Sequence, residues 1–262
     1  MRLGVKLPSA APRDIAVTML VREDVPAVYE VHSRTLDALP ASNLVRRDEP
    51  DDFYAMFDQG GAIIGLTESG RLVGYGMVRP EEPGSDDRKG VEDYVTARES
   101  VFVLDGSAVL PTYWSRGLQR TLIDARLDFA VERGAEHAVC TAAPNNVPSM
   151  RNLTKQGFRI VRAAQKTYGM RYLLWRPAAQ AMPRPGEAES DWRAAEDIAG
   201  ANALFDRGCF AYDAIRGDCG QPFLHFVLPT AVAGETRDDA APAAEALATF
   251  TGAPVPEAIA PR

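Results

Sequence analysis

The residues around Gly117 are suited to binding an anionic group. Pro111 ends a predicted strand, and a short loop containing Gly117 leads into a predicted amphipathic helix over 116–133. Such a junction directs unpaired backbone N–H groups and the positive end of the helix dipole at one point, which suits a pyrophosphate. Arg116 and Arg120 add positive charge. The alternative is an ordinary strand-to-helix turn with solvated arginines.

A second polar segment, 146–158, begins another predicted helix just after a short predicted strand. Asn146, Ser149 and either Arg151 or Asn152 lie near the start of this helix. Polar side chains there can hold a ligand that runs between two neighbouring strand ends. The two segments together predict one binding site at the ends of two strands.

Together these segments resemble the GNAT superfamily of acyl-CoA N-acyltransferases. The run PTYWSRGLQ at 111–119 lies where that family has its P-x-Y-R-G-x-G-h-G loop. Residues 146–158 resemble its N-x-x-S-x-R-x-L-x-K-x-G-F helix, and 22–29 are similar to the start of its first helix. The resemblance covers about 15–176 and implies an N-acetyltransferase that uses acetyl-CoA as a co-substrate.

The resemblance also implies which residues hold acetyl-CoA. The backbone of Val109 and Leu110, at the end of the fourth strand, would pair with the pantetheine arm. Asn146 and Ser149 match positions that contact the cofactor from the other side of the splayed strands. The pyrophosphate loop corresponds to Trp114, Ser115, Arg116, Gly117, Leu118, Gln119, Arg120 and Thr121. Two of these depart from the family pattern and make the loop bulkier, namely Trp114, for a usual Gln or Arg, and Gln119, for a usual Gly or Ala.

The family often has a tyrosine in its last helix that protonates the departing thiolate, and Leu153 occupies that position here. Another group or water must then act as the acid, or the thiolate leaves unprotonated. Tyr168 and Tyr172, in the last predicted hairpin, are candidates to replace the family tyrosine. The alternative for each is a buried structural tyrosine.

Attack of a neutral amine on a thioester needs a base that accepts a proton near neutral pH. Asp105 and Glu99 lie on or just before the strand whose end meets the acyl group, so either is a candidate, and solvated carboxylates are the alternative. His32 and His137 are interpreted as structural histidines. Cys140 has no evident His or Asp partner and is interpreted as a small core residue.

The elements that must position these residues follow the order β-α-α-β-β-β-α-β-α-β-β. The expected fold class is α/β (α+β), a GNAT-like mixed, mostly antiparallel central sheet flanked by helices, with a C-terminal helix–hairpin extension. The segment 80–90 is expected to be an exposed loop. The strands are predicted at 15–21, 62–67, 72–78, 100–110, 137–142, 158–164 and 168–175, and the helices at 24–36, 48–59, 116–133 and 147–156.

The composition changes after residue 176. Ser190 is predicted to cap a helix that runs to Phe205, followed by a hairpin of strands at 209–215 and 223–228. Because this hairpin is apolar on both faces, we expect it to pack on the main domain or to continue its sheet, walling the acceptor pocket or a homodimer interface. The predicted divisions are an N-terminal extension (1–14), an acyltransferase domain (15–176), a linker (177–189), the extension (190–228) and an Ala/Pro-rich tail (229–262).

The 262 residues carry 29 Lys and Arg against 36 Asp and Glu, a net charge of −7 that argues against a general nucleic-acid binder. We expect no membrane span, since no extended apolar run is present, and no secretory signal. Three cysteines without CxxC spacing and three separated histidines argue against a metal site and for a cytoplasmic location.

Two hypotheses of different classes follow. The first is an enzyme that moves acetyl from acetyl-CoA to a primary amine, on a small molecule or a peptide, by direct attack in a ternary complex; a longer or acidic acyl donor is a variant of it. The second is a non-catalytic acyl-CoA-binding sensor or interaction module, which the residues at 114, 119 and 153 suggest.

Overall fold

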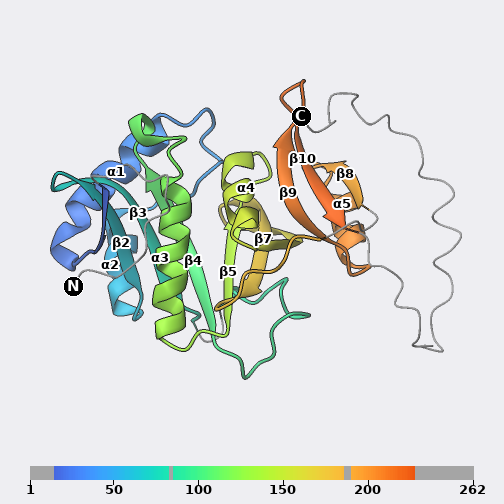
Figure 1. The fold of residues 1–262 in the computed structure, drawn as a ribbon, viewed down its shortest axis with the longest axis horizontal. Coiled ribbons are helices and arrows are strands. Elements are labelled where there is room, and N and C mark those ends of the chain that lie inside the picture. The colour runs from blue at the N-terminus through green and yellow to red at the C-terminus, as the bar shows by residue number, and fades with distance from the viewer. Residues whose placement is uncertain (1–14, 83–84, 186–189, 228–262) are drawn as a thin grey trace, which may run out of the picture.

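The computed structural model describes residues 15–82, 85–185 and 190–227, and within them a single sheet of ten strands carries the fold (Figure 1). The strand order is β1-β2-β3-β4-β5-β7-β6-β9-β10-β8. All neighbouring strands are antiparallel except β4 and β5, which are parallel. The predicted mixed, mostly antiparallel sheet flanked by helices is therefore confirmed.

The elements up to residue 177 follow the predicted order, with two short 3₁₀ helices in addition. The first part of the chain forms β1 (Ile15–Met19), η1 (Arg22–Asp24), α1 (Val25–Asp37), α2 (Pro50–Asp58), β2 (Ala62–Glu68), β3 (Arg71–Pro80) and β4 (Val101–Val109). The second part forms η2 (Pro111–Tyr113), α3 (Leu118–Glu132), β5 (His137–Ala142), α4 (Val147–Lys155), β6 (Arg159–Lys166) and β7 (Gly169–Pro177). The remaining described residues form β8 (Ser190–Ala194), α5 (Ile198–Phe205), β9 (Phe210–Arg216) and β10 (Pro222–Val227).

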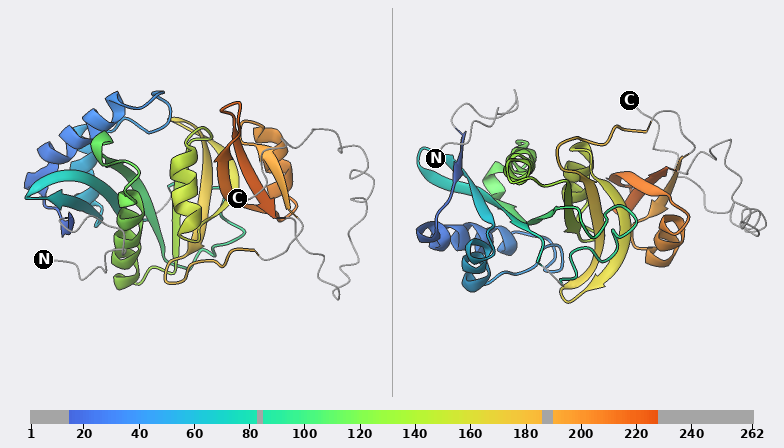
Figure 2. Two further views of the ribbon diagram at one scale, coloured as in Figure 1. Left: turned by 45° about the horizontal axis from the view of Figure 1, so that its top comes forward. Right: turned by 90° about the horizontal axis from the view of Figure 1, so that it is seen from below.

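Helices cover both faces of the sheet (Figure 2). α3 lies across β2, β3 and β4 on one face, with α4 beside it. α1 and α2 lie on the other face, and α5 lies on that face farther along the sheet. None of the helices in the described part of the chain combines the length and apolarity needed to cross a bilayer.

Local signals explain where the helices begin and end. Pro26 is in the first turn of α1, where its missing N–H costs no hydrogen bond, and Asp24 Oδ2 accepts the N–H of Val21 at 2.9 Å. Gly157 follows α4 with a φ of 81°, a left-handed conformation that glycine adopts without strain. These short-range features are the ones on which the predicted helix boundaries depend.

β4 and β5 pair over a short length. Their ladder consists of Val101↔His137, Phe102↔Ala138 and Val103↔Val139. Beyond it β4 contains a β-bulge, because Asp105 and Gly106 together lie opposite the single residue Met77 of β3. β4 therefore bends away from β5, and the two strands are open toward their carboxyl ends.

In the segment predicted as an exposed loop at 80–90, the described residues, 80–82 and 85–90, are largely irregular, as expected, but partly buried. Arg88 Nε contacts Glu81 Oε2 at 2.6 Å, and Asp87 Oδ2 contacts Arg79 Nη1 at 2.8 Å; all four side chains are mostly shielded from solvent. These ion pairs hold the segment against the sheet, which composition alone does not indicate.

The extension differs from its prediction at its start. Residues 190–194 form the strand β8, which pairs with β10 through Trp192↔His225, so the predicted helix beginning at Ser190 is wrong there. The helix in this region is α5, capped by Asp197, whose side chain accepts the N–H of Gly200. A free edge of β10 was available to pair, and this tertiary contact overrode the helical spacing of the apolar residues.

The extension continues the main sheet. β9 pairs with β6 at Ile160↔Ala211, and α5 packs on β6. Tyr172 Oη in β7 donates to the carbonyl of Ala195 at 2.8 Å, which makes this tyrosine a buried structural residue. Its ring, together with Phe205 and Phe226, belongs to the core cluster shared with the rest of the sheet. The division of the chain at residue 176 stays a prediction.

Phe226→Ala tests this shared core. The ring is 0% exposed and lies 5.3 Å from that of Phe205, so the change is expected to lower the free energy of unfolding by about 3–5 kcal/mol. Urea denaturation followed by tryptophan fluorescence and circular dichroism measures it, with the half-buried Phe223→Ala as a milder control. A separate early transition that leaves the remainder folded would contradict the shared core.

Candidate active site

The opening between β4 and β5 leads into a cavity of about 1310 Å³. Its walls come from residues 103–109 of β4, residues 139–142 of β5, the loop before α3 and the start of α4. One small-molecule ligand usually needs about 300–1,000 Å³, so this volume is sufficient for two ligands side by side.

Backbone groups of β4 face this cavity. Leu110 N–H donates to Val73 O of β3 at 2.9 Å. Successive residues of an antiparallel strand alternate sides, so the N–H and C=O groups of Val109 and Ser107 face the side that β5 has left. The Val109 carbonyl accepts the Trp114 indole N–H at 2.7 Å and the Thr35 hydroxyl at 3.3 Å.

The loop before α3 has the geometry of an anion site. Ser115 and Gly117 adopt positive φ values of 63° and 76°, and Gly117 caps α3 without any side-chain hydrogen bond to the first turn. The first N–H groups of the helix therefore point out of the loop without a side-chain cap. Successive N–H groups in such a turn form a concavity that binds anions.

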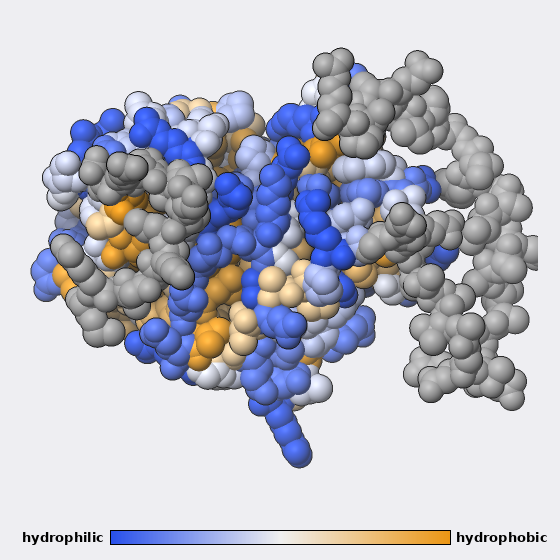
Figure 3. Space-filling view, in the orientation of Figure 1, coloured by the Kyte–Doolittle hydropathy of each residue, from blue (hydrophilic) through white to orange (hydrophobic). Residues whose placement is uncertain are grey.

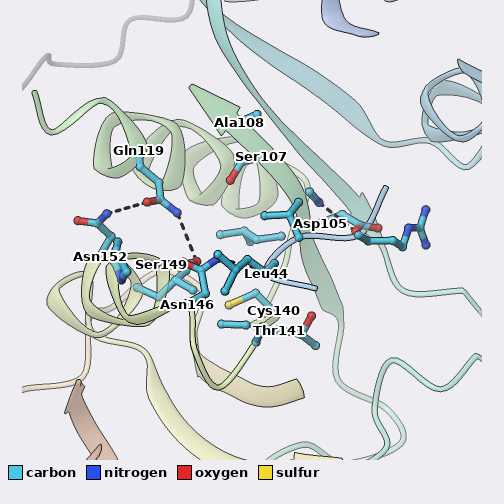
Figure 4. Close-up of a pocket in the computed structure, with 18 of the residues that line it drawn as sticks. Leu44, Asp105, Ser107, Ala108, Gln119, Cys140, Thr141, Asn146, Ser149 and Asn152 are labelled. Carbon is cyan, nitrogen blue, oxygen red and sulfur yellow. Dashed lines mark hydrogen bonds between the residues drawn. The ribbon is translucent and has the colours of Figure 1, made fainter. Parts of the chain in front are cut away.

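The start of α4 is capped and tied to its surroundings. Asn146 Oδ1 accepts the N–H of Ser149 at 3.3 Å, and Asn146 Nδ2 donates to Leu44 O at 3.3 Å. Gln119 of α3 reaches across to α4, donating to Ser149 Oγ at 3.4 Å and accepting from Asn152 Nδ2 at 2.7 Å (Figure 4). The two helices on this face are therefore bridged at the mouth of the cavity.

Cations gather where α3, α4 and β9 meet. Arg120, Arg151 and Lys155 line the cavity. Burial and the neighbouring charges of Arg151 and Arg120 lower the pKa of Lys155, which indicates a concentration of positive charge. In Figure 3 hydrophilic side chains form a band over α4 and toward β9. Asp213 of β9 contacts Arg151 at 3.9 Å and so joins the extension to this cluster.

Most of the predicted cofactor residues line the cavity: Val109, Trp114, Ser115, Gly117, Leu118, Gln119, Arg120, Asn146 and Ser149. The structure does not bring the other three, Leu110, Arg116 and Thr121, to it. Leu110 and Thr121 are buried in the packing of the sheet and α3, and Arg116 folds back over the Tyr113 ring with its guanidinium carbon 4.8 Å from the ring centroid.

Two carboxylates lie at the other end of the cavity. Asp105, on the bulge of β4, accepts from Arg79 Nε at 3.3 Å and from Gly106 N–H at 3.0 Å. Asp48 is 2% exposed and is hydrogen-bonded to Arg46 Nε. Its Oδ2 lies 3.2 Å from where a Cβ on Gly106 would be, so the carboxylate packs directly on the bulge. Asp48 was not among the predicted site residues.

Asp48 has a pKa raised to about 6. Burial is the main cause, and it outweighs the opposing effect of Arg46; the negative charges of Asp105 and Asp52 raise the pKa further. A carboxylate with this pKa is ionised at neutral pH and still binds a proton readily. It therefore has the properties of a general base.

A buried histidine positions Asp48. His32 Nε2 accepts the backbone N–H of Asp48 at 3.1 Å, and its Nδ1 lies 2.7 Å from Tyr75 Oη. Burial, with Arg47 and Arg46 nearby, lowers the pKa of His32 to about 4, so the ring is neutral. Because a backbone N–H can only donate, Nε2 carries no hydrogen, and Nδ1–H donates to Tyr75. His32 is a satisfied structural histidine, as predicted.

Arg126 of α3 supports the bulge from behind. Its Nη1 donates to the carbonyl of Asp105 at 2.9 Å, and its Nε donates to Leu122 O at 3.1 Å. A Cβ on Gly76 would lie 2.9 Å from this Nε, so only glycine at that position leaves room for the guanidinium. Burial lowers the pKa of Arg126 to about 10, which still leaves it charged at neutral pH.

The remaining catalytic candidates are placed differently. Glu99 lies just before β4, at the end where β4 and β5 are still paired, and faces His137 Nε2 at 3.4 Å. The structure therefore does not bring Glu99 to the cavity. Tyr168 does line it, with its hydroxyl 3.5 Å from Thr141 Oγ1. Cys140 also lines the cavity, but burial raises the pKa of its thiol to about 12.

The residues that the sequence prediction missed are Asp48, Arg126 and Arg171. Asp48 lies in the charged run 46–49, which nothing in the sequence marks as buried. Arg126 interrupts the apolar face of α3, and Arg171 interrupts the apolar run of β7. A charged residue at an inward-facing position was the available signal for the two arginines.

The sequence pattern of the acetyltransferase (GNAT) family matches residues 26–158, just over half of the chain. This chain belongs to the GNAT family. It is accordingly an acetyl-CoA-dependent N-acetyltransferase, with acetyl-CoA as the co-substrate typical of the family. In this GNAT protein the two polar segments, 111–119 and 146–158, meet at the open β4–β5 pair and the loop before α3.

A solved structure shares this fold. Arabidopsis thaliana NAA60 in complex with acetyl-CoA is 16% identical, with a TM-score of 0.52 over 63% of this GNAT chain and 99% of that one. The Escherichia coli ribosomal-protein-S18-alanine N-acetyltransferase is 17% identical, with a TM-score of 0.47 over 67% of this chain and 99% of that one. No curated protein matches the sequence.

The raised pKa of Asp48 predicts a pH-dependent stability. Between pH 7 and 5 folded Asp48 takes up a proton, whereas the unfolded residue stays mostly ionised until the pH approaches its ordinary value of 3.8. The free energy of unfolding of the wild type, relative to Asp48→Asn, should therefore rise by about 1 kcal/mol as the pH falls from 7 to 5. Parallel urea denaturation at both pH values measures it, and an unchanged difference would show that Asp48 titrates normally.

Proposed function

We propose that this GNAT protein transfers the acetyl group of acetyl-CoA to a primary amine by direct attack within a ternary complex. The observation that carries the proposal is the buried Asp48 carboxylate, which packs on the β4 bulge in a cavity of about 1310 Å³. That volume supports simultaneous binding of both substrates. Release of CoA thiol with a panel of amines and peptides tests it; saturable acetyl-CoA binding without thiol release from any of them would instead support the sensor hypothesis.

The residues at the open end of the cavity suit acetyl-CoA. The N–H groups at the start of α3, with Arg120, would bind the pyrophosphate. The cavity-facing N–H of Val109 and the backbone of Ser107 would pair with the pantetheine amides, and Asn146 and Ser149 would contact the arm from α4. Acetyl-CoA supplies the thioester, and these groups fix its direction toward the bulge.

Asp48 then acts as the general base. The amine nitrogen forms a bond to the thioester carbonyl carbon, the C–S bond breaks, and the ammonium proton passes to the Asp48 carboxylate. Asp105, which is paired with Arg79, keeps a second negative charge nearby and so helps to hold the pKa of Asp48 high. Tyr168, in the cavity wall, is the hydroxyl assigned to protonate the leaving thiolate.

The proposed reaction proceeds without a covalent acetyl-enzyme. Cys140 is the cysteine in the cavity wall, and burial raises the pKa of its thiol to about 12, so the reactive thiolate is scarce at neutral pH. The described residues place no histidine against this thiol that could activate it. The homodimer and the cytoplasmic location remain predictions.

Asp48→Asn should lower kcat by at least about 100-fold, because the base is removed while the shape is kept. In the wild type, kcat should decline below a pH of about 6, where Asp48 becomes protonated. Steady-state kinetics from pH 5 to 9 measure both. Asp52→Asn is the matched control, since Asp52 also contacts Arg46, at 3.2 Å, but does not line the cavity; loss of its charge should lower the pKa of Asp48 and leave the carboxylate base in place. Equal kcat values for the two variants would exclude Asp48 as the base.

Arg120→Ala should raise the KM for acetyl-CoA about tenfold, because one charge-assisted contact to the pyrophosphate is lost. The KM for the amine should stay the same. Arg133→Ala, at the opposite end of the same helix, is the control and should leave both constants unchanged. If both variants bind acetyl-CoA as the wild type does, the pyrophosphate does not lie at the start of α3.

A further inference from the structure

Arg171 of β7 is a buried cation in the wall of the cavity, and its guanidinium has unused hydrogen-bonding capacity. The residue is 4% exposed and lines the cavity. Its Nη1 donates to Met170 O at 2.8 Å, whereas its buried Nη2 has no hydrogen-bond partner. Its guanidinium lies 4.8 Å from the centroid of the Tyr168 ring.

Two other arginines at this end of the cavity are paired with carboxylates. Arg46 is paired with Asp48 and, at 3.2 Å, with Asp52. Arg79 contacts Asp87 at 2.8 Å and Asp105 at 3.3 Å. Arg171 has no carboxylate partner among the described residues. A buried charge without a counter-ion is costly, so an anion that enters the cavity gains from meeting it.

Arg171 is connected to Asp48, the proposed base, through Tyr168 and Arg46. Two guanidiniums lie within about 6 Å of the centroid of the Tyr168 ring, that of Arg171 at 4.8 Å and that of Arg46 at 5.8 Å. Arg46 is in turn hydrogen-bonded to Asp48. A negative end held by Arg171 and an amine directed at Asp48 can therefore belong to one small molecule. The cavity thus offers a cation for one end of the acceptor and an anion for the other.

We propose that the acceptor is an amine that also bears a carboxylate, an amino acid in the broad sense, and that Arg171 binds its carboxylate. This inference rests on the proposed acetyl transfer and names the substrate class of the same site. A guanidinium matches a planar carboxylate with two parallel hydrogen bonds, and the acidic residues Asp48 and Asp105 nearby disfavour a more highly charged phosphate.

The test compares amino acids, with the amine at either the α or the ω position, with their carboxamides, which differ only in the missing charge. The wild type should prefer the carboxylates. Arg171→Gln should raise the KM for the best carboxylate acceptor by about 30-fold or more, with little change for its carboxamide or for acetyl-CoA. Arg171→Lys should recover part of the loss, because it keeps the charge without the fork. Arg162→Gln, in the neighbouring strand β6 and outside this cavity, is the matched control.

Two results would overturn the inference. The first is that the wild type uses carboxylates and carboxamides equally well. The second is that Arg171→Gln, with an unchanged thermal unfolding temperature, raises the KM for carboxylates and for carboxamides by the same factor. Isothermal titration calorimetry of the same panel in the presence of CoA distinguishes a failure of this inference from a failure of the proposed function. If no acetyl is transferred, the proposed function fails. The inference then stands if the wild type binds carboxylates more tightly than Arg171→Gln does, and falls if it does not.

Discussion

The early divergence of β4 from β5 is the constraint on which the rest of the structure depends. After Val103↔Val139, backbone groups that a longer parallel ladder would pair must find other partners. The Trp114 indole N–H donates to the carbonyl of Val109, and the Arg126 guanidinium donates to the carbonyl of Asp105. The cavity is therefore lined by polar groups whose directions are set before a ligand arrives, which is the arrangement that favours transition-state binding.

Charge is distributed unevenly along this opening. Toward α3 and α4 the cations Arg120, Arg151 and Lys155 line the cavity and suit an anionic cofactor. Toward the bulge, acids and arginines are paired, and Asp48 is held by Arg46 and by the backbone contact to His32. Burial of these groups lowers stability, and that cost is consistent with a functional role rather than a structural one. Although the net charge is −7, the cavity has one positively charged end and one end where acidic and basic side chains are paired.

The parts predicted correctly depend on neighbours in the sequence. Gly117 and Asn146 mark helix starts that their own backbone conformation and side chain create, so the segments around them were identified without a structure. Asp48 gains its raised pKa mainly from burial, and it packs on the β4 bulge more than fifty residues away, which no local pattern contains. Residues 190–194 became a strand because β10 was free to pair. Glu99 carries a carboxylate, as a general base requires, but the register of β4 against β5 places it at the end where the two strands are still paired.

The extension also braces one side of the cavity. β9 packs along α4, and Arg216 at its end donates to the carbonyl of Asn145 at 2.8 Å. This brace stiffens the α4 side of the cavity. On the opposite side, residues 38–49 connect α1 to α2 without regular secondary structure and carry Leu44, Arg46 and Asp48. The carbonyl of Leu44 accepts from Asn146 Nδ2 at 3.3 Å, so the braced α4 side also holds the segment that carries the proposed base.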